Sequence, residues 1–450
     1  MSLVSEAIAR YHKLIESEPY IDLAWAHELE EQIQSAKLDG RPISPVLRPH
    51  FVTKREYTSL VKATETLLSA IVRLEHLVLE TPELLHRVNL LPAERMLASV
   101  EGYSEATITS LLDTALSDRS IKFIDHSADI PPGVLYGDAL SDLYYDAPPI
   151  KQFRRKHRLK KLGGMKYMLS AVNKSFRSFR GKTATKNPSM AIVELRQPFQ
   201  SAVSEHNLLA EFFTSNGIPT EIVTPEQLDY KNGVLQAGDF EIDIVYRRIS
   251  LHEFLVRYDL NHPMIQSYKD GAVCMVNNFR SEIGSKRVIL DLLTDKDVTA
   301  KFPAAERKAI KAHIPWTRLV AAHRTTYGTK TVDLPEFILE RREKLVLKPN
   351  DDSTEMHTVF GAQVDDDRWE QALRQALRTP SVVQEVIEPS HAVFPLLQFG
   401  NMVLKDMSTH VHPHAFFGKV HGASSWLDVA GGGGFSTLTG LAPTFLLEGK

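Results

Sequence analysis

After Met190 the sequence alternates between short apolar runs and an amphipathic segment, a pattern that few folds accommodate. The apolar run 191–195 has the length of a buried strand. Apolar residues at 208, 209, 212 and 213 then form one helix face, which Asn216-Gly217 ends, and a second apolar run follows at 220–223. Because two strands joined through a helix run parallel, a Rossmann-like parallel sheet is predicted here. Gly-x-Gly-x-x-Gly does not follow the first strand, which argues against a dinucleotide site.

The rest of the chain is also predicted to combine helices and strands. From Lys54 to Glu80 apolar residues recur at three- and four-residue spacing, and Thr53 with Glu56 matches a capping box, so a long helix is predicted. With 450 residues the chain is long enough for two or three domains. Further strands are predicted at 120–123, 241–246, 272–276, 344–347 and 381–386, and further helices at 285–293 and 366–377.

The single cysteine limits the available chemistry. Cys274 lies in an apolar run, where cysteine is usually a small core residue, and one cysteine makes neither an internal disulfide nor a cysteine-built metal site. This composition suits a reducing compartment. No window approaches the ~18–20 apolar residues of a membrane span, and the first residues carry no basic leader, so we expect a cytoplasmic protein without membrane insertion. The formal net charge of -3 indicates no particular partner.

Residues 151–186 are rich in lysine and arginine and include no acidic residue. Phe176 and Phe179 lie among these cations, a combination that suits a polyphosphate, a nucleic acid or an anionic surface. The interpretation that we favour is a solvated linker whose charge offsets acidic neighbours, with a nucleic-acid partner not expected. In both cases the stretch is predicted to mark a domain boundary.

Candidate chemistry lies at the ends of two predicted strands. The chain has no Walker A loop, no His-Glu-x-x-His and no Gly-x-Ser-x-Gly. The apolar run 345–347 is followed by Lys348, and a lysine buried at a strand end is costly unless an anion such as phosphate meets it. Gln384 and Glu385 end the later strand, where they suit the edge of an adenine ring.

Several segments together resemble a known family. In order along the chain these are 241–248, Val276-Asn277-Asn278-Phe279 with Ser285-Lys286, 313–318, Val346-Leu347-Lys348-Pro349 and Val383-Gln384-Glu385. Their order and spacing resemble the circularly permuted ATP-grasp proteins, which are relatives of glutathionylspermidine synthase, from about Arg48 to the C-terminus. The resemblance implies a fold of mixed α+β and α/β class: a circularly permuted ATP-grasp core with a Rossmann-like (pre-ATP-grasp) parallel sheet and a helical N-terminal part.

The resemblance also implies a domain organisation. We expect a helical N-terminal region at 1–110, part of the ATP-grasp core at 111–187 with the basic linker at 151–186, a Rossmann-like domain at 188–270 and the nucleotide-binding region at 271–450. The family's activity is the ATP-dependent joining of a carboxylate to an amine through an acyl phosphate. ATP and Mg²⁺ would then be the cofactors, and a small-molecule acid and an amine or peptide-like ligand would be the partners.

By this resemblance, Lys286 and Lys348 would hold the nucleotide phosphates, and Gln384 and Glu385 would lie at the adenine side. The metal positions of the family correspond to Asp113, Asp125 and Ser127.

Four departures from the family pattern concern catalysis. Residues 353–359 replace a glycine-rich loop that covers the phosphates, Leu111 stands at an arginine position, and Ser127 stands at an asparagine position. Gly422-Ala423-Ser424-Ser425 likewise lacks an arginine. We therefore expect a nucleotide-binding protein with weak or lost ligase activity. Such a protein could also use the fold to bind a protein partner. The alternative is an active ligase with altered loops.

One further pattern lies outside the resemblance. His410, His412 and His414 alternate, so on a strand they share one face, and three such imidazoles suit Zn²⁺ or another transition metal. Pro413 is expected to interrupt the strand. We favour the alternative of histidines on an exposed strand face, and we interpret Gly431–434 as a flexible turn.

Overall fold

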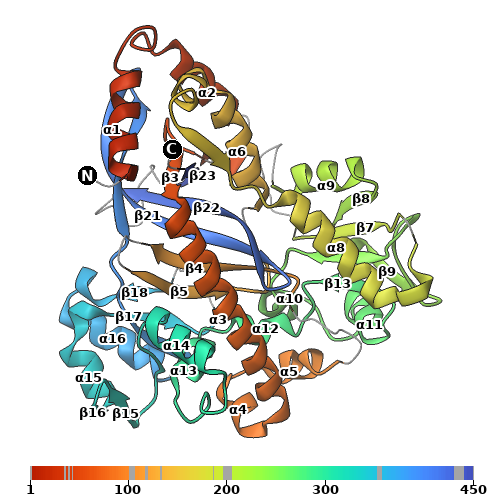
Figure 1. Cartoon of the computed structure of the whole chain (residues 1–450). Coiled ribbons are helices and arrows are strands. Elements are labelled where there is room, and N and C mark those ends of the chain that lie inside the picture. Colours follow the sequence, from red (N-terminus) through yellow and green to blue (C-terminus); the bar gives the residue numbers. More distant parts are fainter. Residues whose placement is uncertain are drawn as a thin grey trace.

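The structure is a computed structural model of the whole chain (Figure 1). It describes residues 3–34, 37–38, 41–42, 44–100, 107–116, 120–131, 134–185, 187–195, 205–351, 357–429 and 440–448. The glycine run 431–434 and most of the segment 353–359 lie outside these residues.

An eight-stranded sheet forms the centre of the molecule, with the strand order β3-β23-β22-β21-β4-β5 (Figure 1). β20 pairs with β21 and β6 pairs with β23, and the pairing is antiparallel except between β3 and β23. The strands span His50–Thr53 (β3), Thr109–Leu116 (β4), Ile121–Ser127 (β5), Arg158–Lys161 (β6), Ser390–Gln398 (β20), Asn401–Phe416 (β21), Lys419–Val429 (β22) and Gly440–Glu448 (β23).

The long helix α3 (Lys54–Glu80) covers one face of this sheet, as the apolar spacing predicted (Figure 1). The predicted capping box is present, because Thr53 accepts from the Glu56 amide while the Glu56 carboxylate accepts from the Thr53 amide. Leucines of α3 pack in one buried cluster with Val411 and Ala415 of β21. Val411 and Ala415 thus face the helix, and the intervening even-numbered residues of β21 face the other way.

The parallel sheet predicted after Met190 is confirmed, with the strand order β13-β12-β7-β8. Its strands are β7 (Met190–Val193), β8 (Thr220–Val223), β12 (Ile244–Arg247) and β13 (Cys274–Val276). It packs with α8 (Met165–Arg180), α9 (Glu205–Ser215), α10 (Leu251–Arg257) and α11 (Pro263–Lys269), and a small sheet of β9 (Leu228–Lys231), β10 (Val234–Ala237) and β11 (Phe240–Glu241) adjoins it.

The basic stretch is not a linker, contrary to our interpretation from the sequence. It includes the last residues of α7 (Pro148–Arg154), the strand β6 at the edge of the large sheet and the helix α8. Met168, Val172 and Phe176 of α8 are buried against the parallel sheet, while its lysines lie at the surface. A run of cations is therefore compatible with a packed helix, because the apolar residues between them recur at helical spacing.

A third sheet has the strand order β14-β19-β17-β18. It contains β14 (Thr317–Leu319), β17 (Leu345–Pro349), β18 (Val359–Phe360) and β19 (Ser381–Glu385), and it packs with α15 (Leu334–Glu340) and α16 (Asp366–Ala376). The helix predicted at 285–293 is interrupted, because α12 (Ser281–Ser285) ends before Lys286 and α13 (Val288–Thr294) begins after Arg287. This break places two cations at a helix junction.

The remaining elements complete the layers. In the N-terminal part these are α1 (Leu3–Ile15), α2 (Ala24–Gln34), β1 (Lys37–Leu38), β2 (Arg41–Pro42), α4 (Pro82–Arg87) and α5 (Pro92–Ala98). Further along the chain they are α6 (Val134–Asp146), α14 (Ala304–His313), β15 (Arg324–Tyr327) and β16 (Lys330–Asp333). Residues 1–110 thus also contribute β3 and the start of β4 to the large sheet. Of the helices in the described ranges, none is both long and apolar enough to cross a bilayer.

Candidate functional site

The face of the large sheet opposite α3 gathers several of the predicted site residues. Asp113 of β4 lies directly across from Asp125 of β5. His412 Nε2 is 2.9 Å and His410 Nδ1 is 3.5 Å from the same oxygen, Asp113 Oδ1. Burial alone would raise the pKa of Asp113, but the two imidazoles outweigh it and hold that pKa well below its usual range. His410, His412 and His414 thus share one face, as predicted, and His410 and His412 are directed at a carboxylate. The expectation of an exposed face was wrong, because His414 is buried and the side chain of His412 is only 12% exposed.

Asp125 is held by an arginine that the sequence analysis did not single out. Arg287, at the α12–α13 junction, donates from Nε to Asp125 Oδ2 at 2.8 Å and from a terminal nitrogen to the Pro349 carbonyl at 2.8 Å. Burial raises the pKa of Asp125, yet Arg287 and then Lys348 lower it below its ordinary value. Arg287 therefore connects the end of β17 to the β4–β5 hairpin.

The predicted metal residues, as the structure places them, do not fit Mg²⁺. Asp125 has an arginine partner and Asp113 has two imidazoles beside it, whereas Mg²⁺ prefers several oxygen ligands. Ser127 is half-buried across from Leu111, whose side chain is buried and apolar. A Mg²⁺ ion bound to Asp125 would lie next to the guanidinium of Arg287, which repels it.

Lys286 lies in a closed cluster of carboxylates. Its Nζ is 2.8 Å from Glu282, 3.2 Å from Glu94 and 3.3 Å from Asp351, and its side chain is 1% exposed. Burial alone would lower the pKa of Lys286, but Glu282, Glu94 and Asp351 outweigh it and raise the pKa. All three hydrogens of this ammonium have acceptors within the protein, so none is directed at a ligand.

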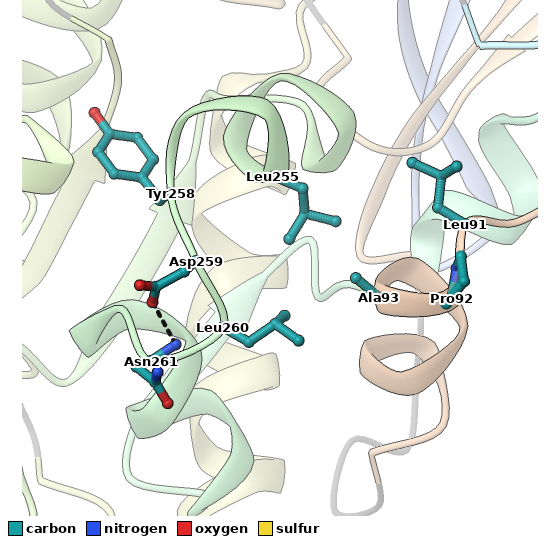
Figure 2. Close-up of a pocket in the computed structure, with 8 residues that line it drawn as sticks. All are labelled: Leu91, Pro92, Ala93, Leu255, Tyr258, Asp259, Leu260 and Asn261. Atoms are coloured by element: carbon teal, nitrogen blue, oxygen red, sulfur yellow. Dashed lines mark hydrogen bonds between the residues drawn. The ribbon is translucent and has the colours of Figure 1, made fainter.

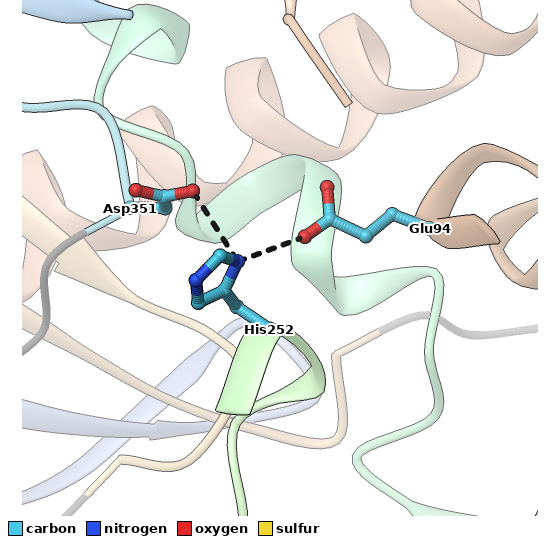
Figure 3. Close-up of side chains that lie close together, drawn as sticks. All are labelled: Glu94, His252 and Asp351. Carbon is cyan, nitrogen blue, oxygen red and sulfur yellow. Dashed lines mark ion pairs between the residues drawn. The ribbon is translucent and has the colours of Figure 1, made fainter. Parts of the chain in front are cut away.

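His252 adds an imidazole at the edge of the same cluster. Figure 3 shows its ring between the carboxylates of Glu94 and Asp351, and one donor atom from each residue lies within 4.8 Å of the others. Three such donors suit a metal ion, but the Lys286 ammonium already lies within 3.3 Å of both carboxylates. We therefore interpret the cluster as a structural ion-pair network.

Lys348 differs from Lys286. It is the fourth residue of β17 and is 4% exposed, yet no residue in the described ranges makes an ion pair or hydrogen bond with its ammonium. Its charge lowers the pKa of Asp125, so the two groups are near one another without direct contact. The structure thus brings Lys348, Asp125 and Asp113 to one region, whereas the ammonium of Lys286 is engaged by three carboxylates.

Gln384 and Glu385 are engaged within the third sheet and its surroundings. Gln384 Nε2 donates to the Thr317 hydroxyl at 3.1 Å, and the Gln384 side chain is buried. Glu385 accepts from the Trp316 amide at 3.3 Å and from the Tyr327 hydroxyl at 2.7 Å. Their place at the adenine side stays a prediction.

Two cavities lie away from these residues. One, of about 610 Å³, lies between the start of α5 and the α10–α11 connection, and Figure 2 shows Leu255 and Leu260 directed toward Pro92 and Ala93 across it. The other, of about 570 Å³, follows one side of α8. Neither is lined by Lys286, Lys348, Asp113 or Asp125, and the apolar wall of the first does not suit a phosphate.

A buried ion pair lies just after the end of β5. Asp129, two residues after the end of β5, pairs with Arg247 at the end of β12, and the Arg247 side chain is 0% exposed. This pair joins the large sheet to the parallel sheet. The sequence signal for it was available, because Arg247 ends an apolar strand as Lys348 does.

Structural comparison identifies the fold. A glutathione synthetase-like effector from Globodera pallida, solved in its apoform, matches with a TM-score of 0.62 at 13% identity, over 96% of this chain and 98% of that chain. The chain has an ATP-grasp-type fold. Two other matches have TM-scores below 0.5. A candidate γ-glutamylcysteine synthetase from Methylobacillus flagellatus has a TM-score of 0.41 at 12% identity, over 88% of this chain and 87% of that chain. A RimK-domain ATP-grasp protein from Sphaerobacter thermophilus has a TM-score of 0.28 at 14% identity, over 57% of this chain and 90% of that chain. No family model and no curated protein matches the sequence.

The ATP-grasp-type fold was therefore predicted correctly from short motifs in a chain that shares little identity with its structural neighbour. At this identity the similarity establishes the fold alone.

Proposed function

We propose that this protein binds a nucleotide through its phosphates on the ATP-grasp-type fold, and that its ligase turnover is weak or lost. The observation that carries the proposal is the contrast between the two candidate lysines. Lys348 is buried at a strand end without a partner among the described residues, whereas Lys286 has three carboxylate partners. A buried ammonium without an anion is unfavourable, so Lys348 is the cation with capacity for a phosphate.

The arguments against turnover come from charge. Phosphoryl transfer needs cations around the transferred group, and losing one stabilising donor typically lowers kcat by about 10²–10³-fold. Here Lys286 is neutralised, Arg287 pairs with Asp125, and Leu111 offers no charge. ATP would supply the phosphoryl chemistry when bound, and the chain's own contribution is limited to holding it at Lys348.

The finer organisation belongs to the same proposal. The β4–β5 hairpin, from early in the chain, joins C-terminal strands β20–β23 in one sheet, which supports a circularly permuted arrangement. We retain residues 271–450, together with parts of 111–187, as the nucleotide-binding region. The competing function is an active carboxylate–amine ligase, which would release ADP from ATP in the presence of its acid and amine.

We expect ATP to stabilise the protein and Lys348→Met to remove the effect. At about 100 times Kd a ligand that binds only the folded state adds about 2.7 kcal/mol, which raises Tm by several degrees. The measurement is Tm against ATP concentration, with and without Mg²⁺. Lys344→Met, an exposed lysine just before the same strand, is the matched control and should keep the full shift. An equal shift in Lys348→Met, or none in the wild type, contradicts the proposed nucleotide binding.

A further inference from the structure

The solvent side of α8 carries positive charge that the described part of the chain leaves unpaired. Figure 1 shows α8 lying over the parallel sheet, against which its apolar residues are buried. On the opposite side Lys166, Lys174 and Arg177 are exposed, and none of them makes an ion pair with a described residue. Arg180, by contrast, pairs with Asp243 at 4.0 Å. The linker interpretation, under which no nucleic-acid partner was expected, was wrong, and the helix holds these three cations on one face.

The charge of α8 is one-sided. Its sequence contains four basic residues and no acidic one, although the whole chain has a formal net charge of -3. A solvated helix usually carries both signs, as in α16, where Arg374 pairs with Glu370 at 2.6 Å. At the neighbouring β21–β22 turn, Glu65 of α3 already pairs with Lys419 at 2.8 Å. The cations of α8 are therefore available to an anion outside the chain.

The three cations lie along one hollow of about 570 Å³. The hollow follows α8 at helical spacing, and its other lining residues include Ser170 and Asn173. From Lys166 to Arg177 the helix rises by about 16 Å, which matches about five nucleotides at the ~3.4 Å rise of a stacked strand. Hydroxyl and amide groups between cations are common partners of phosphate and sugar oxygens. The shape and chemistry of this side thus suit an extended polyanion.

Aromatic rings lie beside the cations. Lys174 Nζ is 4.2 Å from the centre of the Phe417 ring at the β21–β22 turn, and Lys166 Nζ is 4.9 Å from the centre of the Tyr167 ring. The Tyr167 ring stacks on His421, with their centres 3.8 Å apart. All three rings are half-buried, so part of each faces solvent. An acidic peptide needs only the cations, whereas rings beside cations also offer stacking surfaces to bases.

We propose that the solvent side of α8, together with the β21–β22 turn, binds single-stranded nucleic acid. The three unpaired cations contact the phosphates, and Phe417 and Tyr167 contact the bases. Contacts of these two kinds read no base edges, so the surface binds with little sequence preference. This surface is separate from the residues of the proposed nucleotide binding, because Lys348 does not line the hollow.

The test is fluorescence anisotropy of a short labelled oligouridine and a short labelled oligothymidine with the full chain. Both should bind, and affinity should fall roughly 20-fold between 50 and 200 mM salt, since three neutralised phosphates give a slope of about -2. The triple variant Lys166→Gln, Lys174→Gln and Arg177→Gln should weaken binding at 50 mM salt by at least about tenfold. Phe417→Leu should weaken it by at least about fivefold through lost stacking. Circular dichroism of each variant checks that the fold is kept.

Two controls make the result specific. The triple variant Lys301→Gln, Lys308→Gln and Lys311→Gln, in and just before α14, removes the same charge from exposed lysines and should bind the strands like the wild type. Labelled polyglutamate should bind more weakly than the oligonucleotides, and Phe417→Leu should not affect it. No binding by the wild type at 50 mM salt, equal losses in the two triple variants, or polyglutamate binding as tight as that of the oligonucleotides overturns the proposal.

Discussion

Lys286→Met is expected to lower the free energy of unfolding by about 3–5 kcal/mol, which is the usual cost of removing one partner of a buried ion pair. The substitution leaves Glu94, Glu282 and Asp351 close together without a cation, and Glu94 and Glu282 are almost fully buried. Burial already raises the pKa of Glu282 despite Lys286, so this group loses the contact that favours its charged form. The measurement is urea unfolding followed by circular dichroism.

Two comparisons make this result specific to the cluster. Lys344→Met removes an exposed lysine and should change stability by less than about 0.5 kcal/mol. Glu282→Gln added to Lys286→Met removes one surplus carboxylate and should recover part of the loss, which a double-mutant cycle measures. A change below about 1 kcal/mol in Lys286→Met is incompatible with a structural role for this lysine.

Asp129→Ala is expected to have a similar effect, again about 3–5 kcal/mol. The substitution leaves the Arg247 guanidinium fully buried. Of the acceptors that the described residues offer it, Asp129 and the Ile249 carbonyl, only the carbonyl is left. The pair also joins the large sheet to the parallel sheet, so its loss should lower the cooperativity of unfolding as well as the midpoint. Equilibrium unfolding followed with two probes, fluorescence and circular dichroism, measures the midpoint and the cooperativity.

The matched comparison for Asp129 is Glu253→Ala. It removes an exposed ion pair with Arg257 in α10, four residues away, and such pairs contribute about 0.3–0.5 kcal/mol. If Asp129→Ala is no more destabilising than Glu253→Ala, the Asp129–Arg247 pair does not stabilise the fold.

Local patterns were sufficient to predict part of the secondary structure. The helix α3 was predicted with its bounds and its cap, and the strands β7 and β8 and the helix α9 were predicted with the correct parallel arrangement. The prediction about Pro413 was wrong. β21 continues through it to Phe416 with a register shift between Pro413 and Ala415, because a bulge accommodates the missing amide.

The roles of the charged residues were not available from local patterns. Lys348 follows a predicted strand and Lys286 lies at the start of a predicted helix. Only the tertiary structure shows that Glu94, which is 192 residues from Lys286 in sequence, lies beside Lys286. The same holds for Arg287 and Asp125, which are 162 residues apart. Periodicity predicts which side chains are buried, but the partner of a buried charge depends on how distant elements pack.

ADP release from ATP in the presence of Mg²⁺ and a panel of amino acids, glutathione and polyamines decides between a binding protein and a ligase. We predict a rate for the wild type that equals the rate for Lys348→Met, because Lys286, Arg287 and Asp125 are engaged within the protein. The same preparation must show the ATP-dependent rise in Tm, so that any lack of ADP release is measured on a protein that binds ATP. ADP release well above that of Lys348→Met with any acid and amine pair contradicts this account and establishes the ligase.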